Sequence, residues 1–499
     1  MKFGKSLASP KSDLLFYWII PILVIVLPTI IFVIYRAANI SFTHDECLSY
    51  GISTGVDTFT KTPNNHLLNT LLIKFFDSIT GNSELSLRMP NVLAFILYCI
   101  SGLGIIRNIR KPVISVFFMA ILVMNTMMLD FFGLARGYGL SMGLSMAGFY
   151  YLFMLDDLAL PLKKYLVYFV LTLIFSMLAV YANLSVVNLH IAILIILIAG
   201  LIPYLKTTLT RTKFKVTLIF GGILLVDLLV LLPAIFRLMM LRDKNELACF
   251  GGSEGLFKTT IASLIKTFIY YVPYTLETFS IVQSFVIIVF AISGIWVVIK
   301  LFRKKFDNFS RTFFILLLLL LAPVLQNYFF NIPYPTERTA LLYYPVFSLL
   351  LIFLFSNAIS LSMYKFIKAL FVAVLVGTTS FIAFNSYKNF NLIYSCSLWK
   401  YDTYDKQFLE IIDKDRLADG VQDSVRISCT WLYEPAINFY RITRNYTWLM
   451  PADRQGPGIE GDYYICAAQE LPLIKCDSLI ILKVFDDAEV HLLKSYKAK

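Results

Sequence analysis

The sequence predicts a multi-span α-helical membrane protein that ends in a small extracytoplasmic α/β domain. Its 499 residues are 58% hydrophobic and 15% charged, with a mean hydropathy of +0.73, whereas soluble domains carry about 25% charged residues. Long apolar runs recur through most of the chain, and from Asn385 onward the composition is that of a soluble domain. These observations exclude disordered, fibrous and disulfide-scaffold proteins.

Eleven apolar runs are long enough to cross a hydrocarbon core of about 30 Å, which takes about 20 residues. The first run is too long for a signal peptide and has no cleavage site after it, so we expect it to be retained. The runs cover Leu14–Ala38, Leu85–Ile106, Pro112–Leu129, Ala135–Leu155, Tyr165–Tyr181, Val186–Leu205, Val216–Phe236, Ile281–Leu301, Thr312–Phe330, Thr339–Ser356 and Phe366–Phe384.

The net charge of +12 predicts the orientation of these spans. From Asn385 onward the chain has 14 basic and 16 acidic residues, so the excess of Lys and Arg lies entirely in the apolar part. There it occupies every second loop, as in Arg107–Lys111, Lys163–Lys164 and Arg303–Lys305. Basic loops stay in the cytoplasm. We therefore expect a multi-pass plasma (inner) membrane protein with its N-terminus in the cytoplasm, and an odd number of spans places the C-terminal part outside.

Two outer segments are long, and the C-terminal part has its own pattern of secondary structure. Residues 39–84 and 237–280 form the long outer loops, each with a short apolar stretch that we expect to lie as a helix at the interface. These stretches are Leu67–Phe76 and Ile261–Tyr274. In residues 385–499 we expect helices at Lys406–Asp415 and Pro435–Ile442 and strands at Val425–Cys429, Tyr463–Ala467 and Leu479–Phe485.

The cysteines do not form a metal-binding pattern. Cys99 lies within a span, and the other six lie on the outer side, where disulfides persist. Six cysteines allow 15 pairings, of which Cys466 with Cys476 is suggested only by their closeness in sequence. The other outer cysteines are Cys47, Cys249, Cys396 and Cys429.

The first outer loop contains two groups of polar residues that can carry chemistry. His44, Asp45 and Glu46 follow the first span, and partial desolvation there would raise a carboxylate pKa toward the range of a general base. The alternative is that Asp45 or Glu46 caps the following helix. Asn64 is either a helix cap or a site residue, and His66 is either structural or a ligand for phosphate or metal.

Three arginines complete this set of outer-face residues. Arg136, before Tyr138, suits phosphate oxygens because its guanidinium is a planar fork of donors; the alternative is a salt bridge to Asp130. Arg338, after Glu337, begins span ten, and Arg88 begins span two. Either can instead be an interfacial arginine. Together these residues suit a substrate with an apolar tail in the bilayer and a phosphate at its surface.

A transporter or flippase for lipid-linked sugars is the main alternative to an enzyme. Transporters place binding groups near the bilayer midplane, and Asp227 is a charged residue within a span. We interpret Asp227 as hydrogen-bonded to a neighbouring helix. The gathering of the other polar residues at one face argues against alternating access.

Several of these segments together resemble a known family. They are Asp45-Glu46, Asn64–Asn69, Ser83–Asn91, Ala135–Tyr138 and Glu337-Arg338 with Tyr344-Pro345. The chain resembles bacterial membrane glycosyltransferases of the GT-C fold, in the subgroup similar to protein O-mannosyltransferases and to the lipid A aminoarabinose transferase. The resemblance covers about residues 10–385.

The resemblance implies an inverting transfer of a hexose or pentose from a polyprenyl-phosphate donor to a hydroxyl of a lipid, glycan or protein on the outer face. It makes residues 1–384 the catalytic transmembrane domain and residues 385–499 an accessory domain. Asp45 matches the catalytic base and Glu46 the second acidic residue. It names no certain cofactor and allows a divalent cation, and we assign no metal site. The matching donor-site residues are Arg136, Tyr138, Arg338, Glu337, His66 and Arg88.

Overall fold

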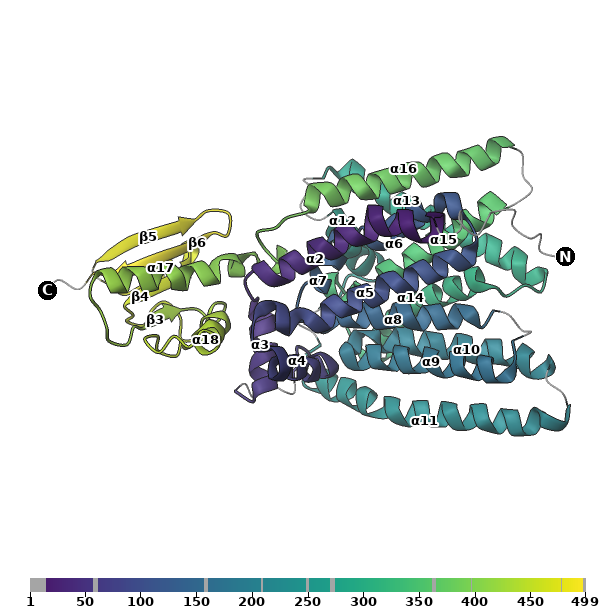
Figure 1. The fold of residues 1–499 in the computed structure, drawn as a ribbon, viewed down its shortest axis with the longest axis horizontal. Coiled ribbons are helices and arrows are strands. Elements are labelled where there is room, and N and C mark those ends of the chain that lie inside the picture. The colour runs from purple at the N-terminus through teal and green to yellow at the C-terminus, as the bar shows by residue number, and fades with distance from the viewer. Residues whose placement is uncertain are drawn as a thin grey trace.

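The computed structural model describes residues 15–56, 62–156, 160–207, 210–247, 251–269, 274–360, 365–395, 397–476 and 478–496. Figure 1 shows a bundle of long helices and, at the end opposite the N-terminus, a small domain that contains a sheet. The predicted fold class, a multi-span helical protein with a C-terminal α/β domain, is therefore confirmed.

Nine helical segments of the described chain are long and apolar enough to cross a membrane, and one bent pair of helices brings the count to as many as ten. The first segment, Leu15–Asn39, consists of two π-helical turns followed by α2 (Leu27–Asn39). The others are α5 (Glu84–Ile109), α9 (Leu162–Ala182), α10 (Val187–Thr207), α11 (Thr210–Asp243), α13 (Leu276–Phe302), α14 (Asn308–Phe330), α15 (Tyr343–Ser360) and α16 (Lys365–Asn389). The sequence predicted eleven spans, and the difference lies in the third and fourth.

The third predicted span is not a continuous helix. It consists of α6 (Ser115–Val123) and α7 (Thr126–Phe132), bent by 68°. Between them the side chain of Asn125 accepts a hydrogen bond from the amide of Met128 at 2.9 Å. Asn125 therefore caps a new helix inside an apolar run, a boundary that hydropathy alone does not reveal.

The fourth predicted span, α8 (Gly137–Met154), is a helix buried inside the bundle and is not among the segments apolar enough to cross a membrane. It packs between α5 and α9. A Cβ on Gly143 would lie 2.3 Å from the carbonyl oxygen of Ala94, so only glycine permits this close approach of α8 to α5. The small residues that lower the hydropathy of α8 are those that let it pack in the centre.

Short helices and strands lie at the end of the bundle that is next to the C-terminal domain. α3 (His44–Thr54) and α4 (Leu67–Thr80) belong to the first outer loop, and Figure 1 shows them next to that domain. The second loop forms α12 (Ala262–Ile269), and its strand β1 (Gly251–Gly252) pairs antiparallel with β2 (Tyr334–Pro335). Both predicted interfacial stretches contain a helix: α4 extends to Thr80, and α12 ends at Ile269, with residues 270–273 of the predicted stretch outside the described residues.

The C-terminal domain has a four-stranded mixed sheet in the order β3-β4-β6-β5. β3 runs parallel to β4, and the other neighbours are antiparallel. The two predicted helices and three predicted strands are present, and the inner strand β6, which pairs with both β4 and β5, is an element that the pattern did not predict. The elements are α17 (Asp405–Ala418), β3 (Ile427–Cys429), α18 (Glu434–Thr443), β4 (Tyr463–Ala467), β5 (Leu479–Phe485) and β6 (Val490–Ser495).

The C-terminal domain is packed onto α3 through a shared apolar core. The rings of Phe42 and Phe439 stack with centroids 4.5 Å apart, and Tyr50 contacts Phe439 edge-on at 5.2 Å. The hydroxyl of Tyr440 accepts a hydrogen bond from the amide of Phe42 at 2.8 Å. The chain segment that carries Asp45 is therefore held by both parts of the molecule.

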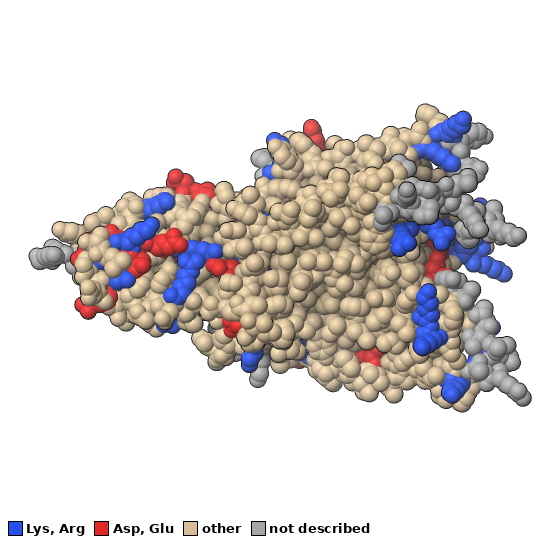
Figure 2. Space-filling view, viewed as in Figure 1, with Lys and Arg blue, Asp and Glu red and all other residues tan. Residues whose placement is uncertain are grey.

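Charged side chains mark the two ends of the molecule differently. In Figure 2, Lys and Arg gather at the end of the bundle opposite the C-terminal domain, and the surface between the ends is almost free of charge. This pattern is typical of a bundle that crosses a bilayer with its basic end in the cytoplasm.

Candidate functional site

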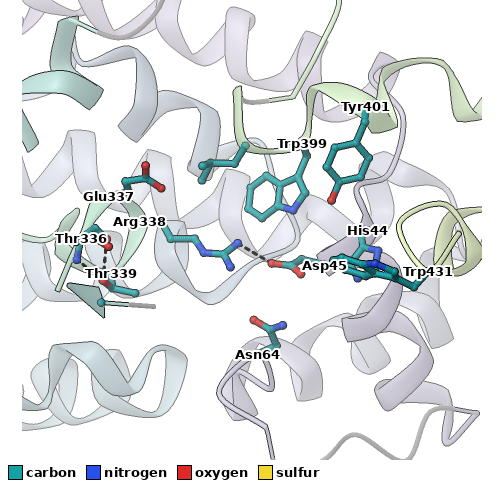
Figure 3. Close-up of a pocket in the computed structure, with 12 residues that line it drawn as sticks. His44, Asp45, Asn64, Thr336, Glu337, Arg338, Thr339, Trp399, Tyr401 and Trp431 are labelled. Carbon is teal, nitrogen blue, oxygen red and sulfur yellow. Dashed lines mark hydrogen bonds and ion pairs between the residues drawn. The ribbon is translucent and has the colours of Figure 1, made fainter. Parts of the chain in front are cut away.

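A polar pocket of about 430 Å³ lies where the end of the bundle meets the C-terminal domain. Figure 3 shows it with Asp45 near its centre. The first outer loop, the second outer loop, the turn before α15 and the C-terminal domain all contribute to its wall. The lining residues are His44, Asp45, Asn64, Gly251, Thr336, Glu337, Arg338, Thr339, Leu398, Trp399, Tyr401 and Trp431.

Asp45 lies in the first turn of α3, where its carboxylate contacts two arginines. Oδ2 of Asp45 is 2.7 Å from Nη1 of Arg338 and 3.4 Å from Nη2 of Arg136. Burial alone would raise the pKa of Asp45, but the charges of Arg136 and Arg338 outweigh it and leave the pKa below its ordinary value. The prediction of a raised pKa is therefore wrong, because the sequence did not show that both arginines contact one carboxylate.

Arg136 is fully buried and holds the loops around Asp45 together. Its Nη1 donates to the carbonyl oxygen of Asp45 at 3.1 Å and to Oγ of Ser49 at 2.9 Å. Its Nη2 donates to Oδ1 of Asn64 at 3.2 Å. The helix-cap hypothesis for Asn64 is wrong, because the N-cap of α4 is His66.

The alternative of a salt bridge between Arg136 and Asp130 is also wrong. Oδ1 of Asp130 lies 2.7 Å from Nη2 of Arg36, which comes from α2. The charge of Arg136 instead lies beside Asp45, and Arg136 does not line the pocket.

Glu46 and Arg88 form a second, closed ion pair behind Asp45. Nε and Nη2 of Arg88 donate to the two carboxylate oxygens of Glu46 at 2.8 and 2.7 Å, and both side chains have no exposed surface. Glu46 also accepts from the amides of Thr43 at 2.9 Å and Ala135 at 2.5 Å. Glu46 thus caps α3, one of the two alternatives for it, and neither Glu46 nor Arg88 lines the pocket.

His66 and Tyr138 are buried and do not line the pocket. Their rings contact each other with centroids 5.0 Å apart. Gly137 lies against the same histidine, since a Cβ there would be 2.7 Å from Cγ of His66. Burial, with the nearby charges of Arg136 and Arg338, holds the pKa of His66 well below its usual value. A neutral, buried imidazole does not fit the hypothesis that His66 binds phosphate as a cation.

Glu337 and Arg338 lie in a 3-10 turn, Glu337–Ala340, between β2 and α15. The amide of Glu337 hydrogen-bonds to Oγ of Ser263 in α12 at 3.1 Å. The guanidinium of Arg338 lies over the ring of Trp399, 5.1 Å from its centroid, and its side chain is 16% exposed. Among the predicted donor-site arginines, Arg338 is the one that faces the pocket.

The C-terminal domain and its linker supply pocket residues that the sequence analysis missed: Leu398, Trp399, Tyr401 and Trp431. Trp399 and Trp431, with Trp448, place three of the five tryptophans of the chain after Asn385. This concentration of tryptophan after Asn385 is the feature of the sequence that could have indicated a contribution of the C-terminal domain to the pocket.

A second cavity, of about 790 Å³, lies inside the bundle between α6, α12, α13, α14, α15 and α16. Its wall is apolar, with side chains such as Phe268, Phe285 and Leu320. Tyr344, at one edge, hydrogen-bonds to Oγ of Thr267 in α12 at 2.9 Å. Since α12 also contacts the turn that carries Arg338, this one helix touches both the apolar cavity and an element that lines the polar pocket.

No group of three or more His, Cys, Asp or Glu in the described part of the chain is arranged to hold a metal ion. Cys466 and Cys476 are both free thiols, so the pairing suggested by their closeness is not formed. Cys47 and Cys429 are also free, and Cys249 and Cys396 lie outside the described residues.

Asp227 is hydrogen-bonded to a neighbouring helix, as predicted. Its Oδ2 lies 3.1 Å from Nε2 of His190 in α10, and Nδ1 of His190 lies 2.9 Å from Oγ of Ser176 in α9. The hydroxyl of Ser176 donates to the carbonyl oxygen of Thr172 at 2.8 Å. This row of residues therefore links the three helices α9, α10 and α11.

No protein-family model matches the chain, and no curated protein matches it in sequence. Its structure is similar to that of ArnT, a lipid A aminoarabinose transferase from Cupriavidus metallidurans, in the apo state, with a TM-score of 0.49 and 11% identity over 95% of this chain and 97% of that one. The same enzyme bound to undecaprenyl phosphate gives a TM-score of 0.48 and 10% identity over the same shares.

A third similar structure is the oligosaccharyltransferase AglB from Archaeoglobus fulgidus, in complex with an inhibitory peptide and a dolichol-phosphate. It has a TM-score of 0.38 and 12% identity over 83% of this chain and 63% of that one. The aminoarabinose transferase is also the enzyme named in the sequence resemblance.

Proposed function

We propose that this protein is an inverting glycosyltransferase that moves a sugar from a polyprenyl-phosphate donor to an acceptor hydroxyl on the outer face of the membrane. The observation that carries the proposal is the carboxylate of Asp45, held between Arg136 and Arg338 in a polar pocket that α12 links to an apolar cavity of the bundle. A carboxylate, a cation at the pocket wall and an adjoining apolar space are what an amphiphilic phosphate-linked donor requires.

The two cavities fit the two ends of such a donor. The apolar cavity between α12 and α16 suits a prenyl chain, because its wall offers few polar partners and lies within the spanning segments. Arg338 suits the phosphate, since a guanidinium binds phosphate oxygens through two parallel hydrogen bonds. Arg136 and Arg88 hold the loops of the site in place. The guanidinium of Arg136 donates to Asp45, Ser49 and Asn64, and that of Arg88 donates to Glu46.

Asp45 is the proposed general base. It accepts the proton of the acceptor hydroxyl as that oxygen attacks the anomeric carbon, and the bond between that carbon and the phosphate oxygen breaks. A positioned base of this kind contributes about 10²–10⁴ in rate. The departing phosphate is an anion, so Arg338 stabilises the charge that develops on it.

The Asp45 carboxylate and the donor phosphate compete for the guanidinium of Arg338. In the unliganded protein it contacts Asp45 at 2.7 Å and so contributes to the low pKa of that carboxyl. A donor phosphate that draws Arg338 away removes one positive charge from Asp45, which raises its pKa and makes it a better base. Donor binding and activation of the base are thereby linked through one side chain.

The test is transfer from a radiolabelled polyprenyl-phosphate monosaccharide by purified protein in lipid vesicles. We expect Asp45→Asn to lower transfer at least about 10²-fold with the thermal unfolding midpoint preserved. Asp243→Asn is the matched control, because Asp243 is exposed at the end of α11 and does not line the pocket. Near-wild-type transfer by Asp45→Asn contradicts the base assignment. Movement of the lipid across the bilayer without bond cleavage would indicate the transporter alternative.

A further inference from the structure

An exposed tryptophan lines the pocket from the side of the C-terminal domain. Trp431 follows β3 after a single residue, and 55% of its surface is exposed. The other pocket tryptophan, Trp399, is only 3% exposed and lies under Arg338. A large apolar ring left open in a polar pocket is ready to cover the apolar face of a ligand.

The position of this ring relative to Asp45 is fixed through His44. The imidazole of His44 contacts Trp431 edge-on, with centroids 5.5 Å apart, and its Nδ1 donates to the carbonyl oxygen of Leu432 at 2.9 Å. The amide of His44 donates to Oδ2 of Asp402 at 2.7 Å. Since His44 directly precedes Asp45, these contacts bind the tryptophan loop and the carboxylate into one unit.

Trp431 and Arg338 lie on opposite sides of Asp45. In Figure 3 the carboxylate of Asp45 has the guanidinium of Arg338 on one side and the rings of His44 and Trp431 on the other. An inverting displacement brings the acceptor and the leaving phosphate to opposite faces of the anomeric carbon. If Arg338 holds the phosphate, the tryptophan side is the side from which the acceptor enters.

We propose that Trp431 is the stacking platform for the acceptor and that the acceptor is therefore a saccharide whose pyranose ring lies on the indole; this rests on the function proposed above. One face of a pyranose presents C–H groups that pack on an aromatic ring, while its edge presents hydroxyls. The pocket supplies matching polar groups in the side chains of Asn64 and Glu337. A serine or threonine side chain of a protein acceptor has no such apolar face.

The experiment compares acceptors and tryptophan variants in the transfer assay. The acceptor probes are a set of p-nitrophenyl pyranosides and a serine-containing tetrapeptide. The variants are Trp431→Ala and Trp431→Phe, with Tyr496→Ala as the matched control, because Tyr496 is 59% exposed in the same domain and does not line the pocket. The Michaelis constants for acceptor and donor are measured separately for each.

We expect transfer to a pyranoside, an acceptor KM raised about tenfold in Trp431→Ala, partial recovery in Trp431→Phe and wild-type values in Tyr496→Ala. The donor KM stays unchanged. Transfer to the tetrapeptide alone, an unchanged acceptor KM in Trp431→Ala, or a rise in the donor KM instead overturns the saccharide platform and leaves the glycosyltransferase proposal standing. A wild-type protein that transfers sugar to no probe overturns both.

Discussion

Two neighbouring carboxylates of α3 have opposite surroundings. Glu46 is closed inside a pair with Arg88 and has no exposed surface, and both of its oxygens are used by the guanidinium and by backbone amides. Asp45, one residue earlier, lines the pocket and pairs with Arg338, which also lines the pocket. Two ion pairs that look alike in the sequence therefore differ in role: one fixes the loops, and the other is accessible to a ligand.

The largest effect is expected from breaking the closed pair. Arg88→Ala leaves the carboxylate of Glu46 buried without its cation, which destabilises a protein by about 3–5 kcal/mol. We expect a much lower thermal unfolding midpoint or loss of folded protein, while Asp45→Asn keeps its midpoint. The measurement is thermal unfolding in detergent, followed by tryptophan fluorescence.

A double variant keeps this comparison informative where Arg88→Ala fails to fold. Glu46→Gln combined with Arg88→Met removes both charges at similar volume, and we expect it to recover much of the stability. Full transfer activity in a folded Arg88→Ala protein would contradict the role of this pair in fixing the loops around Asp45.

The accessible pair, Asp45 with Arg338, is expected to control activity and its pH dependence. Arg338→Ala should lower kcat/KM by about 10–100-fold through loss of one charge-assisted contact to phosphate, with Arg338→Lys less affected. Stability should change little, because Arg338 is partly exposed at the pocket.

The pH dependence of kcat/KM should also shift in one direction when Arg338 is replaced, which would not happen if Arg338 were purely structural. Asp45 must be ionised to act as a base, and Arg338 helps to hold its pKa below the ordinary value. Removing that charge makes ionisation harder, so the acid limb of kcat/KM should move to higher pH in Arg338→Gln. An acid limb at the same pH in both proteins would show that Arg338 does not act on Asp45 in the free enzyme.

The sequence allowed the prediction of features that depend on residue type and on neighbouring residues in the chain. It did not allow the prediction of contacts between residues far apart in the sequence. Apolar runs predicted the long helices, and the hydrogen bond of Asp227 to a neighbouring helix was anticipated. The partners of Asp45 and Glu46 were not, since Arg88 and Arg338 belong to different helices and only tertiary packing decides which carboxylate each contacts. Trp431 was missed because it comes from the other domain.

Two further carboxylates, Asp402 and Asp405, sharpen the comparison, because they are buried without an arginine partner among the described residues. Oδ1 of Asp402 and both carboxylate oxygens of Asp405 have no hydrogen-bond partner within the described residues. Burial raises the pKa of each well above its ordinary value, and for Asp402 the charge of Asp405 adds to this effect. Where Glu46 is stabilised by a cation, these two groups are stabilised by binding a proton.

The smallest of the expected effects follows from Asp405. Since its folded-state pKa lies above its unfolded value near 3.9, the stability it contributes is complete below that pH and is lost as the pH rises through the folded-state pKa. Asp405→Asn removes the ionisable group, so we expect the variant to be more stable than the wild type by about 1–2 kcal/mol at neutral pH and nearly equal to it at pH 4. Unfolding midpoints measured from pH 4 to pH 8 provide the check, with exposed Asp423→Asn as control. A variant less stable than the wild type at neutral pH would mean that the Asp405 carboxylate is ionised and stabilised there by a cation, as Glu46 is by Arg88.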